Sequence, residues 1–218
     1  MTGPIGAAAI AGLGYLIGAI PIGLIVGRLV ADVDIRRHGS RRTGTTNALR
    51  TLGARWAVVV LVLDLAKGLG AVLLARTLYQ AGPPGSPEWV AAAAGVAAVA
   101  GHNWSVFIGF TGGRGVATAA GGLLGMAPLA LAIVVPVMAA VIWRTRYVSL
   151  GSLTAVALAI ALTVGLAATG IGSIGAVGYA LAAGALVLIA HRDNIDRLRA
   201  GTERRIWERD TVVGVGRD

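Results

Sequence analysis

A chain of 218 residues in which 56% are hydrophobic and only 13% are charged, with a mean hydropathy of +0.77, carries more apolar surface than a water-soluble globule of this size can bury, so we predict an integral membrane protein. The formal net charge of +9 comes from basic residues gathered between apolar runs, which indicates topology determinants and argues against nucleic-acid binding. The absence of cysteine excludes disulfides, thiolate metal ligands and a cysteine nucleophile.

Apolar runs follow one another along the chain and predict an all-α integral membrane protein with seven transmembrane helices. Strands of a membrane barrel would alternate apolar and polar residues, whereas these runs are apolar on all sides. The third and fourth runs are shorter than the roughly 20 residues that a span needs. Each of them could therefore be tilted, partly re-entrant or buried by protein. Pro128 is expected to separate the fourth run from the fifth. The runs cover residues 5–30, 54–79, 88–104, 115–127, 129–143, 149–169 and 174–190.

The basic residues predict the orientation. Seventeen of the 19 Lys and Arg residues lie in segments that seven crossings would place on one side, and the connections 80–87 and 170–173 on the other side carry none. The positive-inside rule therefore puts the N-terminus outside and the C-terminus in the cytoplasm of a bacterial plasma membrane. We expect one transmembrane domain over residues 1–218, in which 192–218 form a cytoplasmic basic tail. The basic segments are 28–55, Arg114, Arg144 with Arg146, and the tail.

Small residues and a proline shape the first run. The spacings Gly14-x-x-x-Gly18 and Gly23-x-x-x-Gly27 let neighbouring helices approach closely, so we expect packing there. Pro21 is expected to kink this run.

The segment 34–50 is dense in hydroxyl, amide and guanidinium groups, a composition that suits phosphate. Gly39 and Gly44 permit tight turns that direct backbone N–H groups toward an anion, and Arg50 can act as a bidentate clamp. A basic loop on anionic lipid would explain the arginines but not the other polar side chains beside two glycines. The side chains able to donate are Ser40, Thr45, Thr46 and Asn47.

A second polar segment, residues 101–118, is a glycine-rich turn that leads directly into an apolar helix. The free N–H groups and the positive dipole end of such a helix favour phosphate, and Arg114 adds a full charge. The segment lacks the spacing of a nucleotide-binding P-loop. A helix-breaking turn without a ligand is the alternative.

A third polar segment follows the last apolar run. His191 is the best candidate for proton transfer or for binding a hydroxyl, and Asn194 lies one turn away on the same face. An interfacial cap is the alternative. Because all three segments fall on the predicted cytoplasmic side, they can share one site. Asp64 and Lys67, three residues apart in the second run, are expected to pair and support that site, unless Lys67 contacts a substrate phosphate.

Taken together, these segments resemble the bacterial membrane-integral acyl-phosphate:glycerol-3-phosphate acyltransferases, over nearly the whole chain and in the same order. The family pattern G-S-G-N-x-G-x-T-N-x-x-R reads GSRRTGTTNALR at 39–50. The family has seven membrane helices and a cytoplasmic site, in agreement with the layout inferred from the charges. The other matching stretches are DLAKG at 64–68, GH at 101–102, GGRGVAT at 112–118, RYVSL at 146–150 and HRDNI at 191–195.

The resemblance implies that a hydroxyl of glycerol 3-phosphate attacks an acyl phosphate, which gives lysophosphatidic acid and inorganic phosphate. By matching position it implies that glycerol 3-phosphate is bound by Ser40, Arg50, Arg114, His191 and Asn194, of which Ser40, His191 and Asn194 are catalytic. It places around the acyl phosphate the residues Gly44, Thr46, Asn47, Gly112, Gly113, Gly115 and Thr118. It gives a supporting role to Asp64, Lys67, His102 and Ser149.

Four positions depart from the family pattern. Arg41 and Arg42 replace a Gly-Asn pair, and Thr111 replaces a lysine. Arg114 also replaces a lysine, which keeps the charge but exchanges a point charge for a planar fork.

The implied reaction needs neither a cofactor nor a metal, and the sequence holds no credible ligand cluster. Phosphate is a good leaving group, so the protein mainly has to align two anions that repel one another. The substrates would be acyl phosphate and glycerol 3-phosphate, with membrane lipid as surroundings. Alternatives are an organic-phosphate transporter or exchanger, a non-catalytic lipid-interacting protein, and an acyltransferase with an acyl-thioester donor.

Overall fold

A computed structural model describes residues 2–79 and 86–208. Parts of the predicted connection 80–87 and of the predicted tail 192–218 therefore lie outside the described residues. Within them the chain forms helices and turns and no strand. The elements are α1 (Gly3–Ala19), α2 (Ile22–Ala31), η1 (Ile35–Arg37), α3 (Thr45–Leu52), α4 (Ala54–Leu78), α5 (Ser86–Asn103), η2 (Val106–Ile108), α6 (Val116–Met126), α7 (Pro128–Thr145), α8 (Val148–Ala168), α9 (Ile174–Ala190) and α10 (Arg192–Arg199).

Every predicted apolar run is helical, the first with a break between Ala19 and Ile22, and the ends of each run agree with the structure to within two residues. By length and composition, the described residues contain four candidate membrane spans, Gly3–Ala31, α4, α7 and α8. A fifth arises if α9 and α10, bent by 62°, count as one. The 11 residues of α6 are too few to cross a bilayer, because a helix rises about 1.5 Å per residue. The seven-span count stays a prediction.

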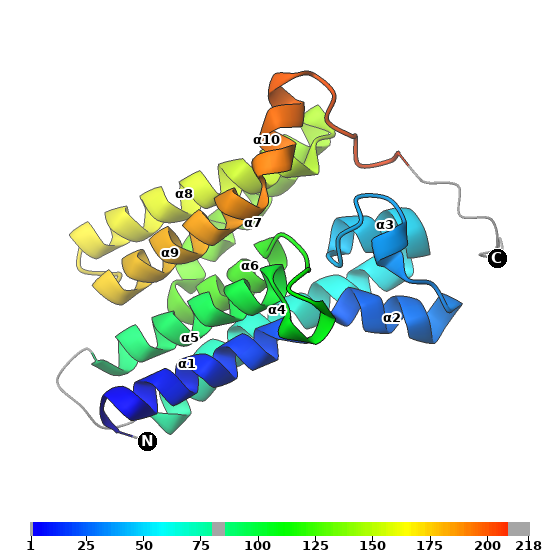
Figure 1. The fold of residues 1–218 in the computed structure, drawn as a ribbon. Helices are drawn as coiled ribbons and strands as arrows, with labels where there is room; N and C mark the ends of the chain where they lie inside the picture. Colours follow the sequence, from blue (N-terminus) through cyan, green and yellow to red (C-terminus); the bar gives the residue numbers. More distant parts are fainter. Residues whose placement is uncertain (1, 80–85, 209–218) are drawn as a thin grey trace.

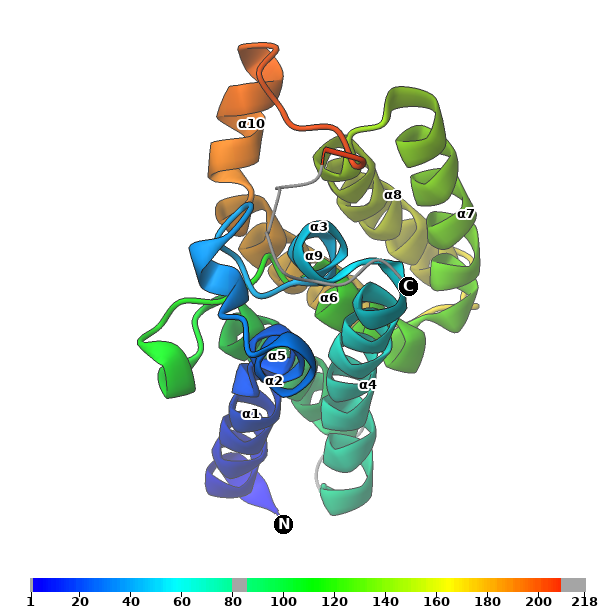
Figure 2. The same ribbon diagram turned by 90° about the vertical axis from the view of Figure 1, so that its right-hand side faces the viewer.

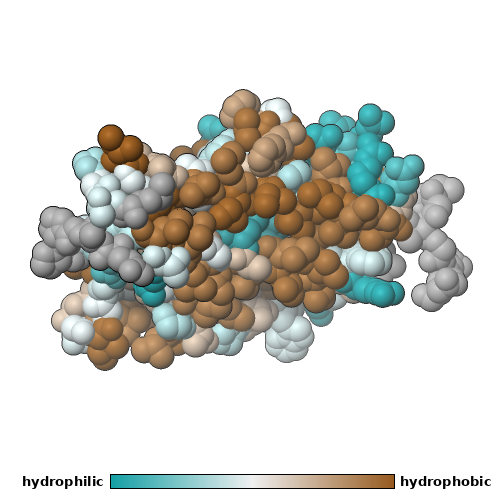
Figure 3. All heavy atoms as spheres, turned by 90° about the horizontal axis from the view of Figure 1, so that it is seen from below, coloured by the Kyte–Doolittle hydropathy of each residue, from teal (hydrophilic) through white to brown (hydrophobic). Residues whose placement is uncertain are grey.

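The long helices run side by side, and the short helices α2, α3 and α10 lie away from the N-terminus (Figure 1). A quarter turn places α3 close to the viewer, below α10 (Figure 2). Hydrophobic residues cover most of the face seen from below, and hydrophilic residues gather toward one end of it (Figure 3). This distribution fits a protein with lipid around its helices and a polar end in water.

The break between α1 and α2 confirms the predicted role of Pro21. Proline has no N–H to continue the helix, so α1 ends at Ala19 and α2 begins at Ile22. The carbonyl of Ile20 at the break accepts a hydrogen bond of 3.1 Å from the Lys67 ammonium of α4. Pro128 likewise begins α7, directly after α6.

Close packing of α1 on α5 confirms the first glycine prediction. A Cβ atom at Gly14 or Gly18 would collide with the backbone of Ala94 or Ala98 in α5.

The second glycine pair serves a different purpose from the one predicted. A Cβ atom at Gly23 would meet the carbonyl oxygen of Thr43, and one at Gly27 would meet the side chain of Ile35. These glycines therefore seat the polar segment that precedes α3, and the prediction of helix packing was wrong for them.

Candidate active site

A cavity of about 500 Å³ lies where the three polar segments meet, so their predicted convergence is confirmed. Its polar wall comes from α3, the start of α6 and the region around α10. Its apolar wall comes mainly from α4, α6 and α7, with Val148 at the start of α8. Predicted site residues that line it are Ser40, Gly44, Thr46, Asn47, Arg50, Asp64, His102, Arg114, Gly115, Ser149, His191 and Asn194. Lys67, Gly112, Gly113 and Thr118 are not among its lining residues.

Two helices begin at this cavity. Gly44 and Gly115 are the N-cap residues of α3 and α6, and neither helix has a side-chain cap. Thr46 and Val116 also line the cavity, so the first turns of both helices face it. Unpaired N–H groups and the positive ends of two helix dipoles therefore converge there, an arrangement that attracts anions. The sequence predicts the helix start at α6 but not the one at α3, because the composition of 34–50 is typical of a loop.

Asn47 organises the segment before α3. Its side chain is buried, and its amide nitrogen donates to the carbonyls of Ile35 (2.7 Å) and Arg42 (2.8 Å). Its Oδ1 accepts a 2.9 Å hydrogen bond from the backbone N–H of Ser40. Both amide hydrogens are thus used within the segment, so in this structure Asn47 fixes the loop and presents no free donor to an anion. Gly39 adopts φ +58°, as a tight turn requires, whereas Gly44 has φ −83°.

His191 lies at the junction just past the end of α9 and is 2% exposed. Its Nδ1 is 2.8 Å from the carbonyl oxygen of Val187, which can only accept, so Nδ1 carries the proton and Nε2 is the basic nitrogen. Burial lowers the pKa of His191 to about 4, and nearby Arg114 acts in the same direction. The imidazole is therefore neutral at pH 7 and able to accept a hydroxyl proton.

Asn194, in the first turn of α10, has its amide nitrogen 2.6 Å from Glu203 Oε1. Its buried Oδ1 has no hydrogen-bond partner within the part of the chain that the structure describes. Since Asn194 and His191 both line the cavity, this wall offers two acceptors to a ligand hydroxyl.

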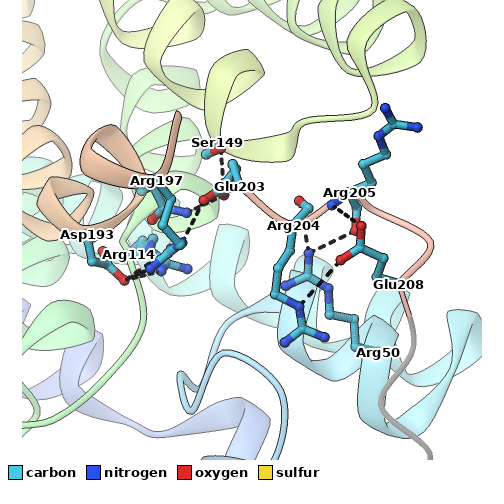
Figure 4. Close-up of polar contacts among 10 residues, drawn as sticks. Arg50, Arg114, Ser149, Asp193, Arg197, Glu203, Arg204, Arg205 and Glu208 are labelled. Atoms are coloured by element: carbon cyan, nitrogen blue, oxygen red, sulfur yellow. Dashed lines mark hydrogen bonds and ion pairs between the residues drawn. The ribbon is translucent and has the colours of Figure 1, made fainter. Parts of the chain in front are cut away.

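A segment beyond α10 crosses the site, and the sequence did not foresee it. Arg50 Nη2 donates to the backbone carbonyls of Arg205 (3.1 Å) and Arg204 (3.5 Å) (Figure 4). The Glu203 carboxylate accepts from the Ser149 hydroxyl (2.8 Å) and from Asn194. Glu203 stands beside two arginines in a tail that carries several other acidic residues, so the sequence offers no signal that singles it out.

Arg114 reaches the cavity from the loop before α6. Its Nη2 lies 2.8 Å from Asp193 Oδ2. Its buried Nε has no hydrogen-bond partner among residues 2–79 and 86–208. A guanidinium held at one nitrogen and open at another can still bind an anion.

The predicted pairing of Asp64 and Lys67 is confirmed, at 2.9 Å inside α4. His102 Nδ1 of α5 lies 3.4 Å from the same Asp64 oxygen. All three side chains are buried, and the cluster ties α4 to α5 and to the α1–α2 break. Lys67 is thus a structural support here and not a cavity-lining cation.

Gly112 and Gly113 seat the second loop against α5. The Gly113 N–H donates to the His102 carbonyl at 3.0 Å, and a Cβ atom at Gly113 would collide with the His102 ring. Thr118, fully buried in the first turn of α6, packs with its backbone against Gly68 of α4. These residues do not line the cavity. Any effect that they have on a bound acyl phosphate would therefore be indirect, through the loop and helix start that they hold in place.

Comparisons with known proteins point to one family. The sequence profile of the family described as "Glycerol-3-phosphate acyltransferase" matches residues 8–201. The chain is 47% identical over 195 residues to glycerol-3-phosphate acyltransferase 2 of Moorella thermoacetica, covering 89% of this chain and 95% of the relative. It is 46% identical over 198 residues to glycerol-3-phosphate acyltransferase of Synechococcus sp., covering 90% and 94%.

The fold has a solved counterpart. The chain is similar, with a TM-score of 0.80 and 35% identity, to a crystal structure of PlsY, an integral membrane glycerol 3-phosphate acyltransferase, in its glycerol 3-phosphate form. The match covers 91% of this chain and 94% of that one. The lysophosphatidic acid form of the same enzyme matches with a TM-score of 0.78.

Proposed function

Because the chain belongs to the glycerol-3-phosphate acyltransferase family, we propose that it transfers an acyl group from an acyl phosphate to glycerol 3-phosphate. The products are lysophosphatidic acid and inorganic phosphate, so the reaction is the first acylation of phospholipid synthesis. The observation that carries the proposal is one cavity in which two helix N-termini and arginines meet a His191–Asn194 wall.

The reaction requires alignment of the two substrates more than it requires a strong acid or base. A hydroxyl oxygen of glycerol 3-phosphate bonds to the acyl carbonyl carbon, the carbon–oxygen bond to phosphate breaks, and phosphate leaves with the bonding electrons. Both reactants carry negative charge, so fixed positive groups must hold them together in a site that water enters poorly. The first turns of α3 and α6, Arg50 and Arg114 supply such groups.

The polar wall suits the acceptor substrate. We assign the hydroxyl of glycerol 3-phosphate to His191 and Asn194, and its phosphate to Ser40, Arg50 and Arg114. Neutral His191 can accept the hydroxyl proton at Nε2, because its ring is unprotonated at pH 7 and its hydrogen lies on Nδ1. When the substrate binds, the Arg50 guanidinium would release the backbone carbonyls of the tail and donate to the substrate phosphate instead. The phosphate is the stronger acceptor because it is charged.

The donor fits the remaining surface. The acyl phosphate head would lie at the N-termini of α3 and α6, near Gly44, Thr46 and Gly115. Apolar side chains continue the cavity between α4, α7 and α8, where an acyl chain would replace water at a hydrophobic surface. These side chains are Leu61, Leu65, Val135, Met138, Ala139, Ile142 and Val148.

We place the site at the cytoplasmic face of a bacterial plasma membrane, in a multi-pass chain of seven helices with the N-terminus outside. The distribution of Lys and Arg supports this orientation. Since the chain has no cysteine, single-cysteine variants at exposed Ile171 and Arg199 report on the two sides. A membrane-impermeant maleimide should label Ile171→Cys in intact spheroplasts and Arg199→Cys only after lysis. The opposite pattern would reverse the orientation.

The activity is tested by donor choice. Purified protein in detergent should form lysophosphatidic acid from acyl phosphate and glycerol 3-phosphate, and little or none from acyl coenzyme A. Preference for the thioester would assign a different donor. No product with either donor, together with glycerol 3-phosphate exchange in sealed vesicles, would favour a transporter.

A further inference from the structure

Four alternating charges connect two parts of the polar wall, the loop before α6 and the region around α10. Arg114 contacts Asp193 at 2.8 Å, and both terminal nitrogens of Arg197 lie 3.3 Å from the same Asp193 oxygen. Arg197 Nε in turn donates to Glu203 Oε2 at 2.8 Å (Figure 4). Glu203 also holds Asn194, so a continuous chain of contacts joins Arg114 to Asn194.

Asp193 lies behind the site rather than in it. Arg114 and Asn194 line the cavity, whereas Asp193 and Arg197 do not. The Asp193 side chain is 40% exposed and that of Arg114 only 16%. Burial alone would raise the pKa of Asp193, but the positive charges of Arg114 and Arg197 lower it below the usual value. Asp193 is therefore ionised at neutral pH and is the anionic centre between two cations.

Asp193 can fix the orientation of the Arg114 guanidinium, because it contacts one of its three nitrogens. A guanidinium is planar, so a carboxylate that fixes one terminal nitrogen also limits the direction of the others. Nη2 is held by Asp193, while the buried Nε has no hydrogen-bond partner among the described residues. Without the carboxylate, repulsion from Arg42 and Arg197 would act on Arg114 unopposed.

We propose that Asp193 is a positioning residue that orients Arg114 so that its remaining N–H groups face the substrate phosphate. The inference rests on the proposed function. It also accounts for arginine at this position: donors on three nitrogens let one end be fixed while another binds, whereas a lysine carries all its donors on one atom.

The test compares Asp193→Asn with Asp196→Asn, which removes the same charge from an exposed site on the same helix. We expect Asp193→Asn to raise the KM of glycerol 3-phosphate about tenfold and to leave kcat less affected. Asp193→Glu should return this KM most of the way to the wild-type value. Asp196→Asn should change KM less than about twofold. Equal KM values for the two asparagine variants would overturn the proposal.

A double-mutant cycle separates positioning from general support. In an Arg114→Ala background, Asp193→Asn should add little to the KM increase, because the group it orients is gone. An undiminished additional increase would show that Asp193 acts independently of Arg114 and would refute the assignment.

Inorganic phosphate gives a readout that does not need turnover. We expect it to raise the thermal unfolding temperature of the wild type and of Asp196→Asn, and to do so less for Asp193→Asn. If the wild type formed no lysophosphatidic acid, the proposed function would fail, yet this phosphate comparison would still decide the role of Asp193. A phosphate shift unchanged by Asp193→Asn would reject it.

Discussion

Glu203 Oε1 lies 2.6 Å from the Asn194 amide nitrogen and also accepts from the Ser149 hydroxyl, so one tail carboxylate fixes two residues of the cavity wall. The carboxylate is nearly buried, which makes its loss costly for the groups it satisfies. It also determines which end of Asn194 faces the ligand, because the bound nitrogen leaves Oδ1 open.

We therefore expect Glu203→Ala to reduce kcat/KM by roughly 30-fold or more and to lower the thermal unfolding temperature, because Asn194 and Arg197 lose a charged partner. Glu208→Ala is the matched control, since that side chain is about half exposed and pairs only with neighbouring tail residues among those described. Kinetics and thermal unfolding in detergent measure both effects. If the two variants behaved alike, Glu203 would have no special place in the site.

His191 and Arg50 should separate kinetically. His191→Ala removes the proton acceptor and is expected to lower kcat by about 100-fold or more with a smaller change in KM. Arg50→Ala removes a charge-assisted donor and should raise the KM of glycerol 3-phosphate by roughly 10- to 30-fold. Steady-state kinetics with each substrate varied in turn distinguish these patterns. The reverse pattern would exchange the two roles.

The low pKa of His191 predicts how stability depends on pH. Between its folded value of about 4 and the unfolded value of about 6.5, the unfolded chain binds more protons. Stability should therefore fall as the pH drops below about 6.5, by up to roughly 3 kcal/mol from this residue. His191→Gln should show a shallower loss of unfolding temperature between pH 7.5 and pH 4.5. Parallel curves for variant and wild type would mean that His191 titrates normally.

The sequence predicted the helices and the meeting of three polar segments because both follow from long-range patterns. An apolar run of membrane length leaves helix as the simplest way to pair its backbone, and clustered arginines mark one side of the bilayer. The pairing of Asp64 with Lys67 was predictable for a related reason, since an unpaired charge in lipid is costly.

The remaining features depend on tertiary contacts that leave little trace in the sequence. The tail meets Arg50 through backbone carbonyls, which every residue carries. The helix α3 has only eight residues, most of them polar, which is too short for an apolar periodicity to indicate a helix. Asn47 was predicted as a donor because its chemistry suits phosphate, but three contacts within its own segment use the amide.

The Asp64–Lys67 pair gives a prediction about stability: removal of one charge should destabilise the fold more than removal of both. Lys67→Met leaves the Asp64 carboxylate buried without its ammonium partner, at a cost on the order of 3 kcal/mol. The double variant Asp64→Asn/Lys67→Met buries no uncompensated charge and should regain part of that loss. Arg76→Met, at an exposed position of the same helix, controls for loss of a cation. Thermal unfolding in detergent ranks the variants, and a double variant less stable than Lys67→Met would show that Asp64 supports the fold mainly through His102 instead.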